Sequence, residues 1–185
     1  MKLNKIMLAA VMAMGVSSFA NAANQGSGSV TFTGEIIDAP CSIAPGNIDQ
    51  TVPLGQISNL GLKDGRESLV KEDFSIKLED CTAATAQTVK TTFTGEPGGA
   101  TGTDKKMVAF GSGSTAKGAS IVITDSNASN AVVELGKATA GQVIAIGDTE
   151  AELKFQAFLK GNGGALDTIV PGAFTSVVNF ALNYQ

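Results

Sequence analysis

The chain has 185 residues and a formal net charge of −4, and it contains no His and no Trp. Its charged residues are scattered along the sequence, so no basic patch favours nucleic-acid binding. The lack of His excludes catalytic triads and metal sites that depend on this residue.

The N-terminus has the pattern of a secretory signal peptide. Lys2 and Lys5 precede an apolar run, 6–16, that is too short to span a bilayer. Residues 20–22 (Ala-Asn-Ala) then offer a cleavage site of small residues, and a membrane anchor is the alternative interpretation. We therefore expect export, a mature chain that begins at Ala23, and a single domain in what remains.

Both cysteines of the protein, Cys41 and Cys81, lie in the part expected to be exported. An even number of cysteines in an exported protein predicts a disulfide between them, and two free buried thiols are the alternative.

Residues 26–36 alternate between polar residues and residues that are apolar or glycine. Because successive side chains of a strand point to opposite faces, this pattern predicts an extended strand with one face to bury. Glycines on that face would weaken an ordinary core strand, but they suit a place where another backbone comes close. The face would carry Gly26, Gly28, Val30, Phe32, Gly34 and Ile36.

Further strand candidates follow at short intervals, separated by turns rich in Gly, Asn, Asp and Ser. The segment 107–110 is a short apolar run in a loop-rich region, and 150–154 has a helix-forming composition. However, alternation continues through 159 and favours a strand there. The whole pattern predicts an all-β sandwich or barrel. The candidates are 72–80, 88–94, 120–124, 132–135, 142–146, 150–159 and 173–185.

No motif supports an enzyme or a bound cofactor. The segment 113–120 resembles a phosphate-binding loop, but Ala119 stands where the motif requires Lys, so a mobile loop is favoured. The segment 125–136 begins like a calcium loop but lacks its Gly and its final Glu, so a polar turn is favoured. We expect no catalytic residue, no metal and no cofactor.

Together with the signal peptide, several segments resemble the fimbrial subunits (pilins) of the chaperone–usher pathway. The protein is most similar to the major rod subunits of P-pilus-like and type 1-like fimbriae. The resemblance covers the whole mature chain and is most specific at its two ends. It rests on Gly28-Ser-Val30-Thr-Phe32-Thr-Gly34, Asp38-Ala-Pro-Cys41-Ser-Ile43, Cys81, Gly172 and the ending Asn179-Phe-Ala-Leu-Asn-Tyr184-Gln185.

This resemblance implies an incomplete immunoglobulin-like β-sandwich that lacks its final strand and carries an N-terminal donor-strand extension. The protein would divide into a signal peptide (1–22), the extension (23–37) and the pilin domain (38–185). A periplasmic chaperone would fill the gap with one of its own strands. An outer-membrane usher would then exchange that strand for the extension of a neighbouring subunit, giving a homopolymer at the cell surface that supports adhesion.

The resemblance also implies roles for individual residues. The terminal carboxylate of Gln185 would meet basic residues of the chaperone. The donor strand would use Gly28, Val30, Phe32, Gly34 and Ile36. The groove that accepts it, and the chaperone before it, would be formed by Gly172, Phe174, Val178, Phe180, Leu182 and Tyr184.

Three alternatives to a rod subunit remain. Both ends could be edge strands of a complete sandwich. The protein could be a minor adaptor or a sugar-binding adhesive subunit, although its single domain, its donor extension and its few aromatic residues argue against an adhesin. A secreted enzyme is disfavoured by the lack of any motif. We expect neither nucleic acid nor a small-molecule substrate as a partner.

Overall fold

The computed structural model describes residues 28–34, 36, 39–82 and 85–185. The protein divides into two units, Met1–Ile36 and Ile37–Gln185, which are described separately. The expected signal peptide and its cleavage site lie outside the described residues.

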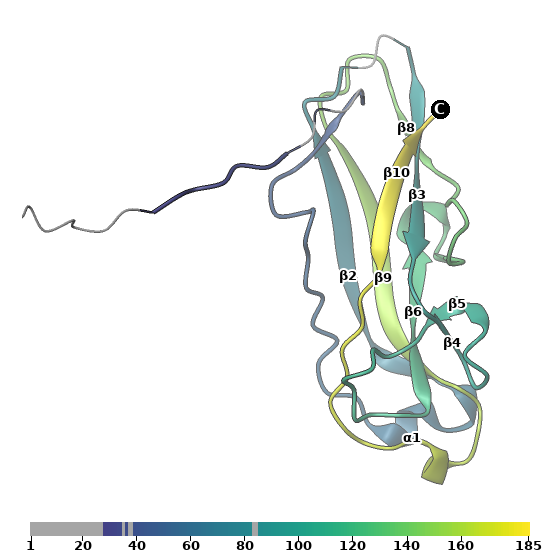
Figure 1. Cartoon of the computed structure of the whole chain (residues 1–185). Coiled ribbons are helices and arrows are strands. Elements are labelled where there is room, and N and C mark those ends of the chain that lie inside the picture. The colour runs from purple at the N-terminus through teal and green to yellow at the C-terminus, as the bar shows by residue number, and fades with distance from the viewer. Residues whose placement is uncertain (1–27, 35, 37–38, 83–84) are drawn as a thin grey trace, which may run out of the picture. The chain divides into compact units, whose positions relative to one another are not determined.

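The second unit folds into two antiparallel β-sheets (Figure 1). The larger sheet has the order β1-β2-β9-β6-β5-β4, with β7 paired to β6, and the smaller sheet has the order β10-β3-β8. The strands are β1 (Ser42–Ile43), β2 (Glu67–Glu79), β3 (Gln87–Thr94), β4 (Pro97–Gly98), β5 (Asp104–Val108), β6 (Ala119–Asp125), β7 (Ala131–Val132), β8 (Gln142–Ile144), β9 (Ala151–Gly161) and β10 (Asn179–Tyr184). Short helical turns are α1 (Asn59–Leu62), η1 (Lys63–Gly65), η2 (Ser126–Ala128) and η3 (Leu166–Thr168).

The two sheets pack face to face, which confirms the expected all-β sandwich. One core cluster joins Ile76 of β2 and Phe155 of β9 with Val89 and Phe93 of β3. These residues alternate along their strands with more exposed residues, as the period of two requires. Burial of such side chains is the main source of stability in this unit.

Most expected strands are present with shifted bounds. The candidate 88–94 lies in β3, and 120–124 lies in β6. All of the segment 150–154 except Glu150 lies in β9, so alternation outweighs its helix-forming composition. The apolar run 107–110 was expected in a loop, but it begins within β5, because Val108 pairs with Ile121 of β6.

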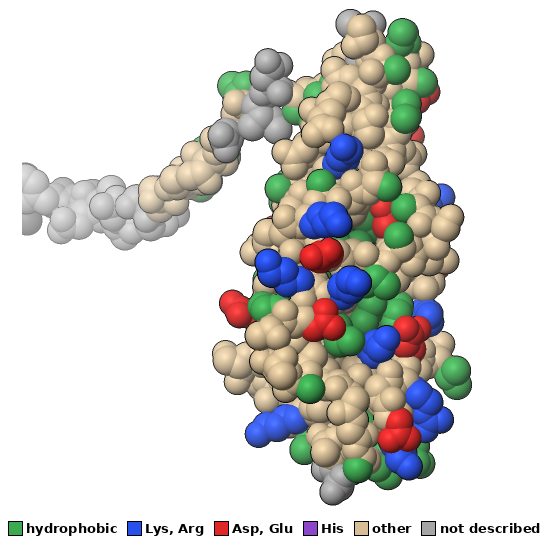
Figure 2. Space-filling model, turned by 90° about the vertical axis from the view of Figure 1, so that its right-hand side faces the viewer, with side chains coloured by type: hydrophobic (Ala, Val, Ile, Leu, Met, Phe, Trp, Pro, Cys, Tyr) green, Lys and Arg blue, Asp and Glu red, His purple; other side chains and the backbone are tan. Residues whose placement is uncertain are grey.

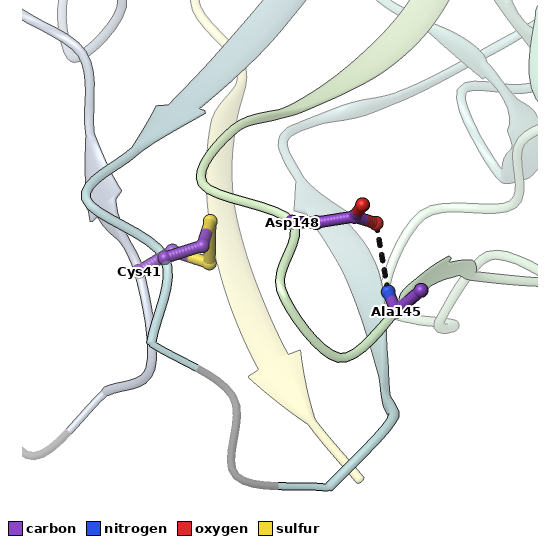
Figure 3. Close-up of a disulfide and its surroundings, with 4 residues drawn as sticks. Cys41, Ala145 and Asp148 are labelled. Atoms are coloured by element: carbon purple, nitrogen blue, oxygen red, sulfur yellow. Dashed lines mark hydrogen bonds between the residues drawn. A yellow bond between two sulfur atoms is a disulfide. The ribbon is translucent and has the colours of Figure 1, made fainter.

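The two cysteines form the predicted disulfide (Figure 3). Cys41 lies directly before β1 and Cys81 lies shortly after β2, so the bond joins the ends of two paired strands. In the neighbouring turn, the backbone N–H of Ala145 donates a hydrogen bond of 2.8 Å to the Asp148 carboxylate. The disulfide therefore links the edge strand β1 covalently to the end of β2.

One side of the sandwich is closed by residues 133–139, which cross from the larger sheet to the smaller one. The N–H of Val133 donates to the carbonyl of Ile123 in β6 (2.9 Å), and the N–H of Gly136 donates to the carbonyl of Phe93 in β3 (2.8 Å). Of the strand expected at 132–135, only Val132 lies in a strand (β7), because the backbone then leaves the larger sheet to make this crossing.

The segment before β10 lies along residues 109–117 instead of a strand. The N–H of Gly111 donates to the carbonyl of Thr175 (2.7 Å), and the N–H of Thr115 donates to the carbonyl of Ala173 (2.9 Å). The last strand, expected from 173, is thus assigned only from Asn179 onward.

Gly172 lies where these two segments come closest. A Cβ atom at this position would lie 2.4 Å from Thr115 Oγ1 and 2.7 Å from the backbone nitrogen of Ala116. Real carbon atoms do not approach so closely, so glycine is the residue that lets the two backbones meet.

We expect Gly172→Ala to lower the free energy of unfolding by about 1–3 kcal/mol, because the added methyl group overlaps fixed backbone. Gly113→Ala is the matched control, since a Cβ at Gly113 has nothing within 4 Å. It should change stability by less than about 0.5 kcal/mol. Urea denaturation measures both variants, and equal stability of the two would contradict this account of Gly172.

Charges of both signs are interspersed on the face of the molecule shown in Figure 2, with no large area of one sign. The ion pairs of β2 and β9 follow this pattern, since Glu67 lies between Lys71 (3.3 Å) and Lys160 (3.6 Å).

Among the residues described, no helix is long and apolar enough to cross a membrane.

Candidate functional site

Among the strands that the structure describes, β10 is a free edge of the smaller sheet. Gln185, just after it, exchanges two backbone hydrogen bonds with Thr88 (2.9 and 2.7 Å). Such pairs alternate along an antiparallel ladder, so the odd-numbered residues of β10 also bond to β3. The even-numbered residues direct their N–H and C=O groups away from β3, toward the free edge: Phe180, Leu182 and Tyr184.

The same alternation continues before β10. Ala173 and Thr175 use their N–H and C=O groups to bond residues 111–115. The backbone groups of the intervening Phe174 therefore point away from these residues. Among the described residues, a row of hydrogen-bonding groups thus remains for a further strand along Phe180, Leu182 and Tyr184, and those of Phe174 are also turned away from residues 111–116.

The side chains of these alternate residues form a half-buried row, here called the apolar strip. The residues Val178 to Tyr184 of the strip pack against the core cluster that joins the two sheets, and Phe174 packs against a second cluster around Leu159. The apolar strip consists of Phe174, Val178, Phe180, Leu182 and Tyr184.

The larger sheet supplies half-buried apolar residues opposite the strip. Ile43 and Phe74 pack against the same core cluster as the strip. The ring of Phe93 lies 6.5 Å from that of Phe180 and 6.5 Å from that of Phe74, so it links the two sides. Within the described part of the protein, no backbone ladder joins β10 to β1 or β2. This side of the sandwich is therefore open, in contrast to the side that residues 133–139 close.

Burial raises the pKa of Tyr184, in the apolar strip, above its ordinary value of 10.0. The folded protein thus holds the phenol proton more tightly than the unfolded one. The stability that this contributes is complete below the ordinary pKa and is lost as the pH rises through the folded-state pKa.

Tyr184 is the only Tyr and the protein has no Trp, so ultraviolet absorbance follows this one residue. We expect a titration midpoint above 10.0 in the folded protein and a return to the ordinary value in denaturant. A midpoint that denaturant leaves unchanged would contradict the half-buried position of this phenol.

The described residues of the first unit, 28–34 and 36, form no helix or strand. Of the extended strand expected at 26–36, these described residues are not assigned to a strand, which requires a partner for its backbone groups; residues 26, 27 and 35 lie outside the described residues. Its apolar residues Val30, Phe32 and Ile36 are exposed, with 90% of Phe32 accessible to solvent. Gly28 and Gly34 have open space around them.

The two segments that resembled a calcium loop (125–136) and a phosphate-binding loop (113–120) contribute to the fold instead. Asp125 ends β6 and accepts a hydrogen bond from the N–H of Asn127 (3.0 Å), which makes a turn. Burial raises the pKa of its carboxyl above the usual value. The segment 113–120, expected as a mobile loop, is tied to Ala173 and Thr175 by hydrogen bonds. No cluster of potential metal ligands is found among the described residues.

Comparison with known proteins identifies the family. The family model described as "Fimbrial protein" matches residues 30–185. The chain belongs to the fimbrial protein family. It is 55% identical to the Fimbria A protein of Serratia marcescens and 46% identical to the Major MR/P fimbria protein of Proteus mirabilis, and each alignment covers 100% of both chains.

Solved structures of fimbrial subunits share the fold. The P pilus rod subunit PapA is 27% identical, with a TM-score of 0.63 over 80% of this chain and 100% of that one. A subunit of a chaperone–usher pilus is 29% identical, with a TM-score of 0.64 over 87% of this chain and 97% of that one. The resemblance to pilins and the surface localisation expected from the sequence are confirmed, and the family is one of structural subunits and not of enzymes.

Some features of this fimbrial protein were not predicted. The contact between residues 109–117 and the segment before β10 joins stretches far apart in the sequence, and no local pattern marks it. Only the glycine at Gly172 signals a close approach of backbones. The crossing made by residues 133–139 was likewise not predicted, because the sequence indicated only a short strand at 132–135.

Proposed function

We propose that this fimbrial protein is a structural subunit of a surface fimbria and polymerises by donor-strand exchange. The extension of one subunit (23–37) adds a strand along the apolar strip of the next, within the pilin domain (38–185). Cleavage after Ala22 precedes assembly. A periplasmic chaperone occupies the strip first, and an outer-membrane usher exchanges it for the extension.

The open edge beside β10 carries this proposal. Its backbone groups and its half-buried side chains belong to the same alternate residues, which is the arrangement that an added strand requires. The extension has the complementary pattern, with exposed Val30, Phe32 and Ile36 at alternate positions. Gly28 and Gly34 lie on the same face and let the added strand sit close to bulky strip residues.

The expected energy of this contact is large. Burial of three large apolar side chains contributes on the order of 6 kcal/mol at about 2 kcal/mol each. The backbone ladder adds about 1 kcal/mol for each hydrogen bond. An apolar strip that stayed open on a free subunit would favour aggregation, which explains the need for a chaperone.

The contact builds a filament because donor and acceptor are different surfaces. Such a heterologous contact does not close on itself, and each added subunit presents a new extension or a new strip. The product is a homopolymer of this protein, which supports adhesion of the cell that carries it. The proposed assembly requires no nucleic acid, metal, cofactor or small-molecule substrate.

Electron microscopy of surface fibres, labelled with an antibody to this protein, tests the proposal. We expect label along the whole shaft, as for the rod subunit PapA to which the protein is similar. Label at fibre ends alone would instead indicate a minor adaptor or an adhesive subunit. A complete lack of label on fibres from cells that export the protein would refute polymerisation.

A further inference from the structure

A dipeptide outside the apolar strip combines two reactive groups. Asn162-Gly163 is the only Asn-Gly sequence in the protein, and it lies directly after β9. Glycine after asparagine leaves the following backbone nitrogen unhindered by a side chain, so that nitrogen can approach the Asn carboxamide.

The side chain of Asn162 is held by a buried hydroxyl. Ser120 Oγ donates a hydrogen bond of 2.7 Å to Asn162 Oδ1, and the same hydroxyl accepts one of 3.0 Å from the N–H of Gly99. Only 1% of Ser120 is exposed. Because Gly99 occupies its acceptor side, the hydroxyl hydrogen is directed at the carboxamide oxygen. A donor at this oxygen makes the carboxamide carbon more electrophilic and stabilises a developing oxyanion.

The backbone nitrogen of Gly163 is free to react. Among the described residues it donates no hydrogen bond. Gly163 has a φ of +78°, and a Cβ there would have nothing within 4 Å, so no side chain or backbone packs against its α-carbon on that side.

Water has access to the same carboxamide. Asn162 and Ser120 line a cavity of about 300 Å³, which is also lined by Lys117. The cavity can supply the water that the reaction consumes and receive the ammonia that it releases.

We propose that Asn162 is a site of spontaneous deamidation assisted by Ser120. The Gly163 nitrogen loses its proton to solvent base and attacks the carboxamide carbon of Asn162. The new carbon–nitrogen bond closes a succinimide ring, the carboxamide nitrogen takes a proton from solvent, its bond to that carbon breaks, and it leaves as ammonia. Water then opens the ring at either carbonyl, giving aspartate or isoaspartate. No oxidant, reductant or cofactor is needed.

The modification changes the surface of an assembled fibre subunit without breaking the backbone. A new carboxylate replaces a neutral amide beside Ser120 in the cavity that Lys117 also lines. The isoaspartate form adds a methylene group to the backbone just after Gly161, where the backbone passes close to the carbonyl of Leu62.

Peptide mass spectrometry of the folded, oxidised protein, incubated at mildly alkaline pH, tests this inference. Conversion at Asn162 should be faster than at Asn59 and Asn127, neither of which precedes a glycine. Ser120→Ala should slow conversion of the folded protein by about tenfold, less than the loss of an enzyme's oxyanion-hole donor. It should have no effect on the denatured protein, where Ser120 and Asn162 are not held together.

Two results would overturn the inference. One is a folded Ser120→Ala variant that converts at the wild-type rate. The other is a wild-type protein in which Asn162 converts more slowly when folded than when denatured, which would mean that the fold protects this residue. The second comparison uses only the wild-type protein, so it remains decisive if Ser120→Ala fails to fold.

Discussion

Replacement of Phe32 by Asp is expected to abolish fibre assembly while leaving chaperone binding intact. In the proposed assembly Phe32, 90% exposed in the free subunit, becomes buried against the apolar strip of the next subunit. Loss of its burial costs about 2–3 kcal/mol, and placing a carboxylate in an apolar site adds several more. A total near 5 kcal/mol weakens the contact by about a thousandfold or more. In the proposed assembly the chaperone contacts the strip and not the extension, so the subunit should still be delivered.

Thr33→Asp is the matched control for this substitution. Thr33 is the next residue along the same extension, but alternation directs it away from the face that carries Phe32. The Thr33→Asp substitution introduces the same charge at nearly the same place and should leave fibre length unchanged. Electron microscopy and co-purification with the chaperone measure the two effects. Fibres of normal length from Phe32→Asp would refute the assigned role of the extension.

Loss of the disulfide is expected to have the second large effect. Cys41 and Cys81 are separated by 40 residues, and the chain-entropy model gives about 3–4 kcal/mol for a loop of this length. The double variant Cys41→Ser/Cys81→Ser should lose this much free energy of unfolding. The bond joins the ends of β1 and β2, so its loss also loosens the edge of the larger sheet beside the open side.

The wild-type protein treated with a reductant serves as the comparison. It lacks the bond but keeps the sulfur atoms, so its urea midpoint should match that of the double variant. If the double variant instead matched the oxidised wild-type protein, the disulfide would have no part in stability. If it were much less stable than the reduced protein, the serine hydroxyls and not the lost bond would account for the effect.

The sandwich was largely predictable because alternation is a local signal. Strand β3 buries every second residue from Val89 to Phe93, and β9 does so from Leu153 to Ala157, and that pattern is visible in the sequence itself. The disulfide followed from export and an even cysteine count. The identity of the half-buried side chains in the last strand followed from the same alternation, down to Tyr184.

What could not be predicted depends on long-range contacts. The sequence does not show that residues 133–139 close one side of the sandwich, or that the segment before β10 lies along 109–117. It also cannot show that the half-buried side chains and the unpaired backbone groups belong to the same residues. That coincidence follows from the register of β10 on β3, which is fixed by Gln185 and Thr88. The described residues of the alternating extension, 28–34 and 36, lie in no strand, as expected if their partner belongs to another molecule in the proposed assembly.

Hydrogen exchange at β10 tests the central claim most directly, with a synthetic peptide of residues 23–37 added to the folded protein. Before addition, the amides of Phe180 and Leu182 should exchange rapidly, while those of Ala181 and Asn183 should be protected by β3. The peptide should protect Phe180 and Leu182, and the same peptide with Phe32→Asp should not. Amides of Phe180 and Leu182 that still exchange rapidly under saturating wild-type peptide would contradict donor-strand addition at this edge.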